Sequence, residues 1–134
     1  MPDQRTRTDR VLTKEEQESL TPKQVLTLLV DGNTRFVAGD ITHRDHQAQV
    51  RAAAQGQWPK GVVLSCVDSR IPVEDVFDCG IGDLFVARVA GNIINQDILG
   101  SMEFACAVSG AKLVLVLGHE HCGAIKGAID RVEM

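Results

Sequence analysis

Aromatic side chains are scarce in this sequence of 134 residues: they make up 4% of it, and tyrosine is absent. A surface that stacks nucleic-acid bases needs several such rings, so a base-stacking function is not expected. The chain also lacks a basic cluster, because its 14 lysines and arginines are scattered and are outnumbered by 18 acidic residues. This charge pattern indicates neither a nucleic-acid partner nor an anionic membrane partner.

Long apolar runs are missing as well. No run approaches the roughly 20 residues that a membrane-spanning helix needs. Residues 1–10 are polar and lack the apolar core of a secretion signal. Four cysteines are too few to indicate a disulfide scaffold. We therefore expect a cytoplasmic protein with reduced thiols and no membrane partner.

What the chain does contain is an alternation of short apolar strands and helical segments. Strands are predicted over 62–66, 84–89 and 112–117, and the last of these is the clearest. Such alternation is typical of an α/β fold with right-handed crossovers. The predicted architecture has three layers, with a central, mainly parallel sheet between helices. Those helices are expected over 72–77, 97–110 and 123–132.

Ahead of the first strand, the sequence predicts an N-terminal helical arm over residues 1–20 and one domain over residues 21–134. A capping box that begins at Thr13 predicts a short helix in the arm. Thr21 and the proline after it predict a longer helix that ends near Val37. The face of that helix expected to pack on the domain holds Val25, Leu28, Leu29 and Phe36.

Two short motifs follow the first and third predicted strands. Cys66-Val67-Asp68-Ser69-Arg70 comes after the first, and His119-Glu120-His121-Cys122 begins 53 residues beyond Cys66. Ligands gather beyond the carboxyl ends of parallel strands, so the two motifs are expected to converge. Two thiolates and one imidazole suit zinc, and three protein ligands leave one position open for water or substrate. The sequence therefore predicts a catalytic zinc site made of Cys66, His119 and Cys122.

Asp68 and Arg70 supply charged groups directly beside the first predicted ligand. A carboxylate there can accept a hydrogen bond from a metal-bound water or bind the metal itself, and an arginine can hold it away from the metal. The alternative interpretation is an ordinary surface ion pair, worth little. Cys79 and Cys106 have no His or Cys partner at ligand spacing, so both are expected to pack in the core.

These motifs resemble those of the β-class carbonic anhydrases, zinc enzymes that interconvert carbon dioxide and bicarbonate. The resemblance covers roughly residues 21–131. It extends beyond the two motifs to six further segments: Gly32–Phe36, Gln57–Pro59, Asp83–Arg88, Ala90–Asn92, Ser101–Ala105 and Gly118–Ala124.

The resemblance implies one zinc ion per chain, held by the three predicted ligands, with Asp68 and Arg70 as a catalytic pair. It also implies that Gln57 donates a hydrogen bond to the substrate, that Phe85 lines an apolar pocket and that the Gly123 backbone lies near the bound oxyanion. Members of the family are dimers or larger oligomers with pockets at the subunit interface. A homodimer or higher homo-oligomer is therefore expected.

One feature departs from the family pattern: its chains usually continue to a further strand, whereas this sequence stops at Met134. Without that strand, Lys112–Leu117 is expected to form an apolar, unpaired edge of the kind that invites association. The resemblance thus implies a domain that lacks the family's C-terminal portion. Two explanations are open, a fragment of a longer protein or a short form completed by oligomerisation.

The function implied by the resemblance is reversible, zinc-dependent hydration of carbon dioxide to bicarbonate and a proton. Two alternatives are open. One is a non-catalytic remnant that is stabilised by zinc or binds bicarbonate, and the other is a related hydrolase acting on a sulfur analogue such as carbon disulfide. His121 is either a proton relay or a solvent-facing turn residue.

Overall fold

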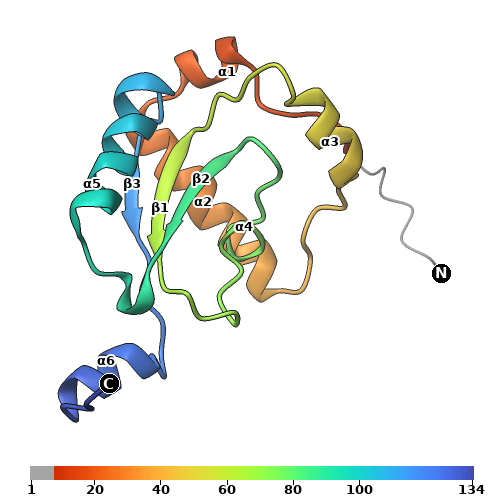
Figure 1. Ribbon diagram of the computed structural model, residues 1–134. Coiled ribbons are helices and arrows are strands. Elements are labelled where there is room, and N and C mark those ends of the chain that lie inside the picture. Colours follow the sequence, from red (N-terminus) through yellow and green to blue (C-terminus); the bar gives the residue numbers. More distant parts are fainter. Residues whose placement is uncertain (1–7) are drawn as a thin grey trace.

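Three parallel strands form the centre of the molecule in the computed structural model, which describes residues 8–134 (Figure 1). The strands are β1 (Gly61–Ser65), β2 (Leu84–Arg88) and β3 (Val114–Val116), in the spatial order β2-β1-β3. Both neighbours of β1 run parallel to it. The predicted α/β fold with a parallel sheet is therefore confirmed. Residues 1–7 of the predicted arm lie outside the described residues.

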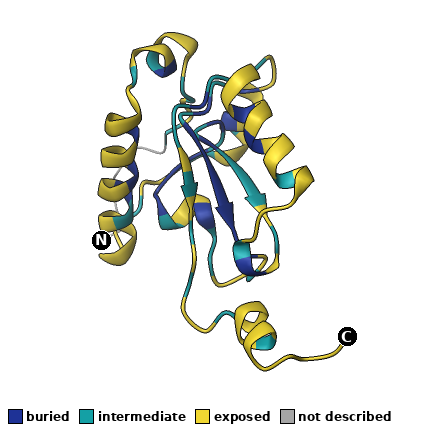
Figure 2. Cartoon of the chain, turned by 90° about the vertical axis from the view of Figure 1, so that its left-hand side faces the viewer, coloured by how far each residue is buried: buried dark blue, intermediate teal, exposed yellow. Residues whose placement is uncertain are grey.

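Helices cover both faces of this sheet and make the predicted three layers (Figure 2). The longest helix lies on one face together with a single-turn helix, and a helix that ends in a π-helical turn lies on the other. In chain order the helices are α1 (Lys14–Ser19), α2 (Pro22–Val37), α3 (His46–Ala52), α4 (Val73–Val76), the 3₁₀ helix η1 (Ala90–Asn92), α5 (Gln96–Glu103), the π-helical turn η2 (Phe104–Val108) and α6 (Gly123–Ile129).

The core is built on β1, every residue of which is buried. Because β1 lies between two strands and two helical layers, its apolar side chains pack against the helices on both faces of the sheet. On the α2 face, Val63 packs with Val25 and Leu29 in the larger cluster. On the α5 face, Val62 packs with Ala105 in a smaller one. The strand that ends at the predicted site is thus buried along its whole length.

The helix that runs from the arm into the domain begins as predicted but buries only part of the predicted face. Its capping box at Thr21 is present. The buried positions are Val25, Leu29 and Gly32, whereas Leu28 and Phe36 are 42% and 37% exposed. The prediction for those two residues is wrong, because the contact of α2 with α4 selects a narrower stripe than the apolar pattern suggests.

Of the two cysteines expected in the core, one is buried and the other is exposed. Cys79 is 5% exposed within the larger cluster, and burial raises the pKa of its thiol to about 11. Cys106 is exposed, so the prediction that it packs in the core is wrong. It lies in η2, where the wider π-helical turn changes the rotation per residue and leaves Ala105 as the buried position. The N-cap of α5 is Asn95, two residues before the predicted cap at Asp97.

The short helix α1 is attached to the domain by one buried polar side chain. Its predicted capping box at Thr13 is present. Gln17 is 4% exposed and its amide nitrogen donates to the carbonyl oxygens of Pro59 and Ser109, both at 2.7 Å. These residues flank β1 and β3, so the described part of the predicted arm packs on its own chain.

The glycine in the middle of α2 lets that helix approach α4 closely. A Cβ at Gly32 would lie 1.9 Å from the carbonyl oxygen of Phe77, a backbone atom that cannot move aside. We expect Gly32→Ala to lower the free energy of unfolding by about 3 kcal/mol or more. Gly100→Ala in α5 is the matched control, because nothing lies within 4 Å of its Cβ position. That control should raise stability by about 0.5–1 kcal/mol. Denaturant melts of both variants test the pair, and equal stability would contradict the packing.

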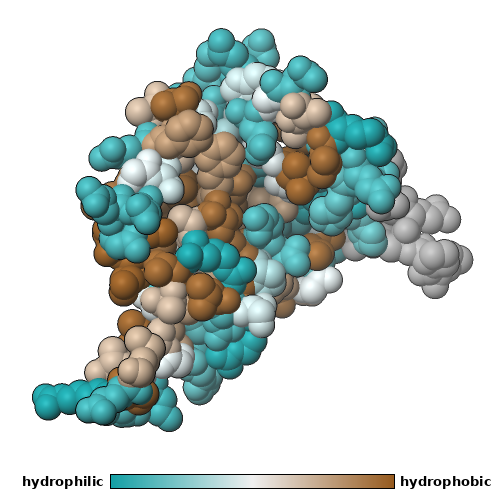
Figure 3. All heavy atoms as spheres, viewed as in Figure 1, coloured by the Kyte–Doolittle hydropathy of each residue, from teal (hydrophilic) through white to brown (hydrophobic). Residues whose placement is uncertain are grey.

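The outer edge of β3 and the helix beyond it are the least covered parts of the molecule. Within residues 8–134 no strand pairs with that edge, as predicted, and Val114 and Val116 are 43% and 56% exposed. Apolar side chains gather on this side, over α5 and β3 (Figure 3). α6 stands apart from the sheet, and none of its residues is buried (Figure 2). Among the described helices, none is both long and apolar enough to cross a bilayer.

Candidate metal centre

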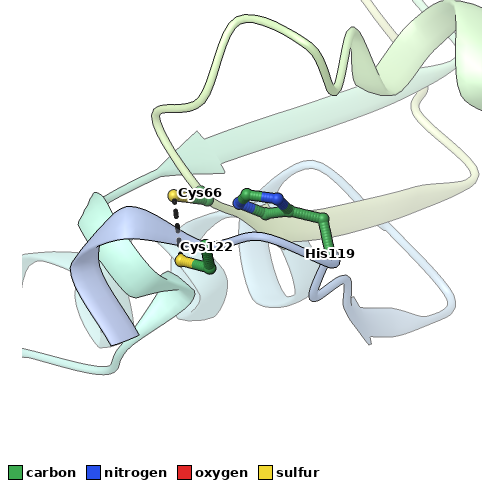
Figure 4. Close-up of side chains that lie close together, drawn as sticks. All are labelled: Cys66, His119 and Cys122. Carbon is green, nitrogen blue, oxygen red and sulfur yellow. Dashed lines mark hydrogen bonds between the residues drawn. The ribbon is translucent and has the colours of Figure 1, made fainter. Parts of the chain in front are cut away.

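Three side chains from separate segments converge beyond the carboxyl ends of β1 and β3 (Figure 4). Cys66 follows β1 directly, His119 lies in the loop after β3, and Cys122 is the N-cap residue of α6. Their donor atoms all lie within 4.8 Å of one another. The parallel sheet thus brings together the two motifs that the sequence separates by 53 residues.

The ring of His119 is oriented as a metal ligand would be. Its Nδ1 lies 2.8 Å from the carbonyl oxygen of Glu120, and a proton on Nδ1 leaves a lone pair on Nε2. Nε2 is buried and has no hydrogen-bond partner within residues 8–134. A buried nitrogen without a partner is costly unless something else binds it. A metal held between this nitrogen and the two sulfurs would satisfy it, with the second ring nitrogen fixed as in many metal sites.

The two sulfurs complete a donor set that fits zinc. Sγ of Cys66 lies 3.9 Å from Sγ of Cys122, and the former also accepts a hydrogen bond from the amide of Gly91 at 3.3 Å. This amide, and then His119, lower the pKa of the Cys66 thiol to about 6, which favours the thiolate form. The interaction with Cys66 is the main reason that the pKa of His119 is raised. Thiolate is the form that binds metal.

The carboxylate of Asp68 lies beside this group but is held by Arg70. Arg70 donates to it from Nε at 3.0 Å, from Nη2 at 2.6 Å and from its own amide at 2.8 Å. These bonds hold the pKa of Asp68 well below its usual range. Nη2 of Arg70 also reaches the carbonyl oxygen of His121 at 3.1 Å, which links the two motifs. Oδ2 of the carboxylate lies 3.9 Å from Nε2 of His119.

Two of the three predicted substrate-binding residues line a groove that includes none of the candidate ligands. Gln57 and Phe85 line one groove of about 780 Å³ along β2 and α5, where Phe85 stacks on Phe104 with ring centres 6.5 Å apart. Gly123 opens α6 next to Cys122 and is exposed. His121 lies in an exposed turn with φ of 56°. The structure therefore separates the groove from the ligand cluster.

Sequence reasoning missed one side chain that contacts both halves of the Cys66 motif. Arg88 donates from Nε to the carbonyl oxygen of Cys66 at 2.8 Å and from Nη2 to that of Asp68. The available signal was a charged residue at the end of an apolar strand, level with the end of β1. Strand order was needed to interpret it, because only the pairing of β1 with β2 places Arg88 beside this loop.

Comparison with known proteins identifies the class to which this fold and site belong. The family model described as carbonic anhydrase matches residues 61–134, which include both motifs. The chain belongs to the carbonic anhydrase family, and its structural neighbours are of the β class.

Individual relatives give the extent of the similarity. A carbonic anhydrase of Mycolicibacterium smegmatis is 45% identical over 106 residues, which cover 78% of this chain and 52% of that protein. The solved structure of the β-carbonic anhydrase CcaA is similar with a TM-score of 0.59 and 30% identity, over 78% of this chain and 53% of that one. A solved tetrameric β-carbonic anhydrase of Sordaria macrospora has a TM-score of 0.58 and 27% identity, over the same shares of the two chains. This chain thus spans about half the length of its relatives.

Proposed function

We propose that this chain carries the metal centre of a β-carbonic anhydrase and that the function is reversible hydration of carbon dioxide to bicarbonate and a proton. The observation that carries the proposal is the buried, unpartnered Nε2 of His119, which faces the sulfurs of Cys66 and Cys122. Three protein ligands leave a fourth position for the reacting water. One zinc ion per chain and a cytoplasmic location belong to the same proposal.

Each polar residue of the site has a role in this reaction. Bound zinc would supply Lewis-acid activation of water, bringing its pKa from about 15.7 toward neutrality. The thiolates of Cys66 and Cys122 would balance the charge of the ion. Asp68 would accept a hydrogen bond from the attacking water and orient its lone pair toward carbon dioxide. Arg70 would keep the Asp68 carboxylate out of the fourth position, because its amide, Nε and Nη2 all donate to that carboxylate.

A second copy of the chain is part of the proposal, because the groove and the ligands are apart in one copy. The Sordaria macrospora relative is described as tetrameric. We propose that Gln57 and Phe85 of one copy face the metal centre of another, where Gln57 would donate a hydrogen bond to substrate and Phe85 would line its apolar pocket. The backbone of Gly123 would lie near the bound oxyanion.

Hydration kinetics combined with metal analysis test the proposed function. We expect the zinc-loaded chain to bind one ion per copy and to hydrate carbon dioxide across pH 7–9 at least 100-fold faster than the same chain stripped of metal. Stopped-flow measurement with a pH indicator reads the rate, and size-exclusion chromatography reads the assembly. A folded, zinc-loaded oligomer with no rate above the metal-free control would contradict the proposal.

A second candidate, a zinc-stabilised module without turnover, is favoured by the open edge of β3 and the poor packing of α6. The same measurements separate it from the enzyme. Bound zinc that raises the melting temperature of a chain with no hydration rate would support this module.

A further inference from the structure

The last residue of β2 contacts the backbone of Cys66, and the turn after β2 contacts its sulfur. Arg88, the last residue of β2, binds the carbonyl oxygens of Cys66 and Asp68 through Nε and Nη2. Three residues later, the amide of Gly91 donates to the Cys66 sulfur at 3.3 Å. One short segment, Arg88–Gly91, therefore holds a candidate ligand and the neighbouring acid.

The contacts of Arg88 replace the hydrogen bonds that a strand would otherwise provide. The ladder between β1 and β2 ends at the pair Ser65 and Arg88, so Cys66 and Asp68 lie beyond it. Cys66 is only 3% exposed, and a carbonyl buried there needs a donor from the protein. A guanidinium is planar, always charged and has donors at a fixed separation. Binding two carbonyls two residues apart fixes the shape of the loop between them.

The contact of Gly91 depends on a backbone conformation that favours glycine. Its φ of 75° is left-handed, and the amide in this conformation donates to the sulfur. A Cβ at this position would lie 3.3 Å from Cδ1 of Ile125 and 3.5 Å from Cβ of Ala124, both on α6. The same turn therefore lies against the helix that carries Cys122 at its start. A hydrogen bond to a ligand sulfur tunes how strongly that sulfur donates to a metal.

We propose that Arg88–Gly91 is the positioning segment of the metal centre. Through the carbonyls of Cys66 and Asp68, Arg88 fixes the positions of the Cys66 sulfur and the Asp68 carboxylate relative to each other. The Gly91 amide orients the sulfur. This inference rests on the proposed function, because it concerns the same site. It adds that the end of β2, which supplies no ligand, governs metal affinity and coordination geometry. Arg88 acts through Cys66 and Asp68, and not by contact with the substrate.

Metal affinity and cobalt absorption of Arg88 variants test this inference. We expect Arg88→Met to weaken zinc binding by about 10- to 100-fold in a chelator competition. We also expect it to shift or weaken the thiolate-to-cobalt absorption of the Co²⁺-loaded chain. Arg88→Lys, which keeps the charge but binds one carbonyl at a time, should lose affinity by a smaller factor. Arg51→Met is the matched control: an exposed arginine on α3 is removed, and both readings should stay at the wild-type value.

The possible results distinguish failure of the positioning role from failure of the proposed function. Wild-type zinc affinity and an unchanged cobalt spectrum in Arg88→Met would overturn the positioning role. If Arg88→Met does not fold, wild-type affinity and spectrum in folded Arg88→Lys would overturn it equally. Weakened binding in the Arg88 variants of a chain with no hydration rate would support the positioning role while contradicting the proposed function.

Discussion

Replacing Arg70 with alanine is expected to abolish most of the hydration rate while leaving zinc bound. The Arg70 side chain donates to the Asp68 carboxylate from Nε and Nη2, and Nη2 also donates to the carbonyl of His121. The backbone amide of residue 70 makes a further bond to the carboxylate, which alanine would keep. Without the side-chain bonds, the amide of residue 70 alone holds the Asp68 carboxylate, whose Oδ2 lies 3.9 Å from Nε2 of His119. The carboxylate can then move into the fourth coordination position. We expect kcat to fall by about 100-fold or more, because the reacting water loses both its place and its acceptor. Stopped-flow kinetics with zinc content measured on the same sample tests this.

A double substitution shows whether Asp68 is the cause. If the freed carboxylate occupies the open position, Asp68→Asn with Arg70→Ala should be no slower than Arg70→Ala alone, so that the two effects are not additive. The absorption of the Co²⁺-loaded single variant should change with the added oxygen ligand and return in the double variant. Arg70→Lys is the conservative control, with one donor group in place of the fork. Additive losses with a constant cobalt spectrum would show that Asp68 does not move.

The fold and the convergence of the motifs could be predicted because they follow from short-range rules. β-branched runs predicted the three strands, and the rule that ligands gather beyond the carboxyl ends of parallel strands placed Cys66 near His119. Capping patterns at Thr13 and Thr21 located two helix starts to the residue. Each of these depends on a few neighbouring residues and on one general property of parallel sheets.

The wrong or missing predictions depend on contacts between distant segments. The π-helical turn that exposes Cys106 is not predicted by the apolar periodicity of its helix. The hydrogen bonds of Arg88 can be predicted only once β2 is known to pair with β1. The groove that Gln57 and Phe85 share depends on how β2 and α5 lie together, and their role in substrate binding stays a prediction. Local patterns fix none of these, because each is set by packing across the sheet.

The helix α6 carries the candidate ligand Cys122 at its start but packs little against the rest of the fold. No residue of α6 is buried, and Ile125 and Ile129 are 45% and 75% exposed. The segment contacts the turn at Gly91 through Ala124 and Ile125, and Arg70 donates to the carbonyl of His121. His119 and Cys122 place their donor atoms beside the sulfur of Cys66. Hydrophobic burial therefore contributes little to holding this helix in place.

Removing the metal is accordingly expected to release α6 while the sheet stays folded. Structural zinc sites contribute about 10–16 kcal/mol of apparent binding free energy, far more than the few exposed contacts of α6. In the chain with a chelator, amide hydrogen exchange over residues 118–134 should accelerate by about 100-fold or more, whereas β1 should keep its protection. Zinc should restore the protection in the wild-type chain but not in Cys66→Ser, which removes a ligand outside the exchanging segment. Slow exchange in α6 with the chelator present would show that packing, and not the metal, holds the two halves of the site together.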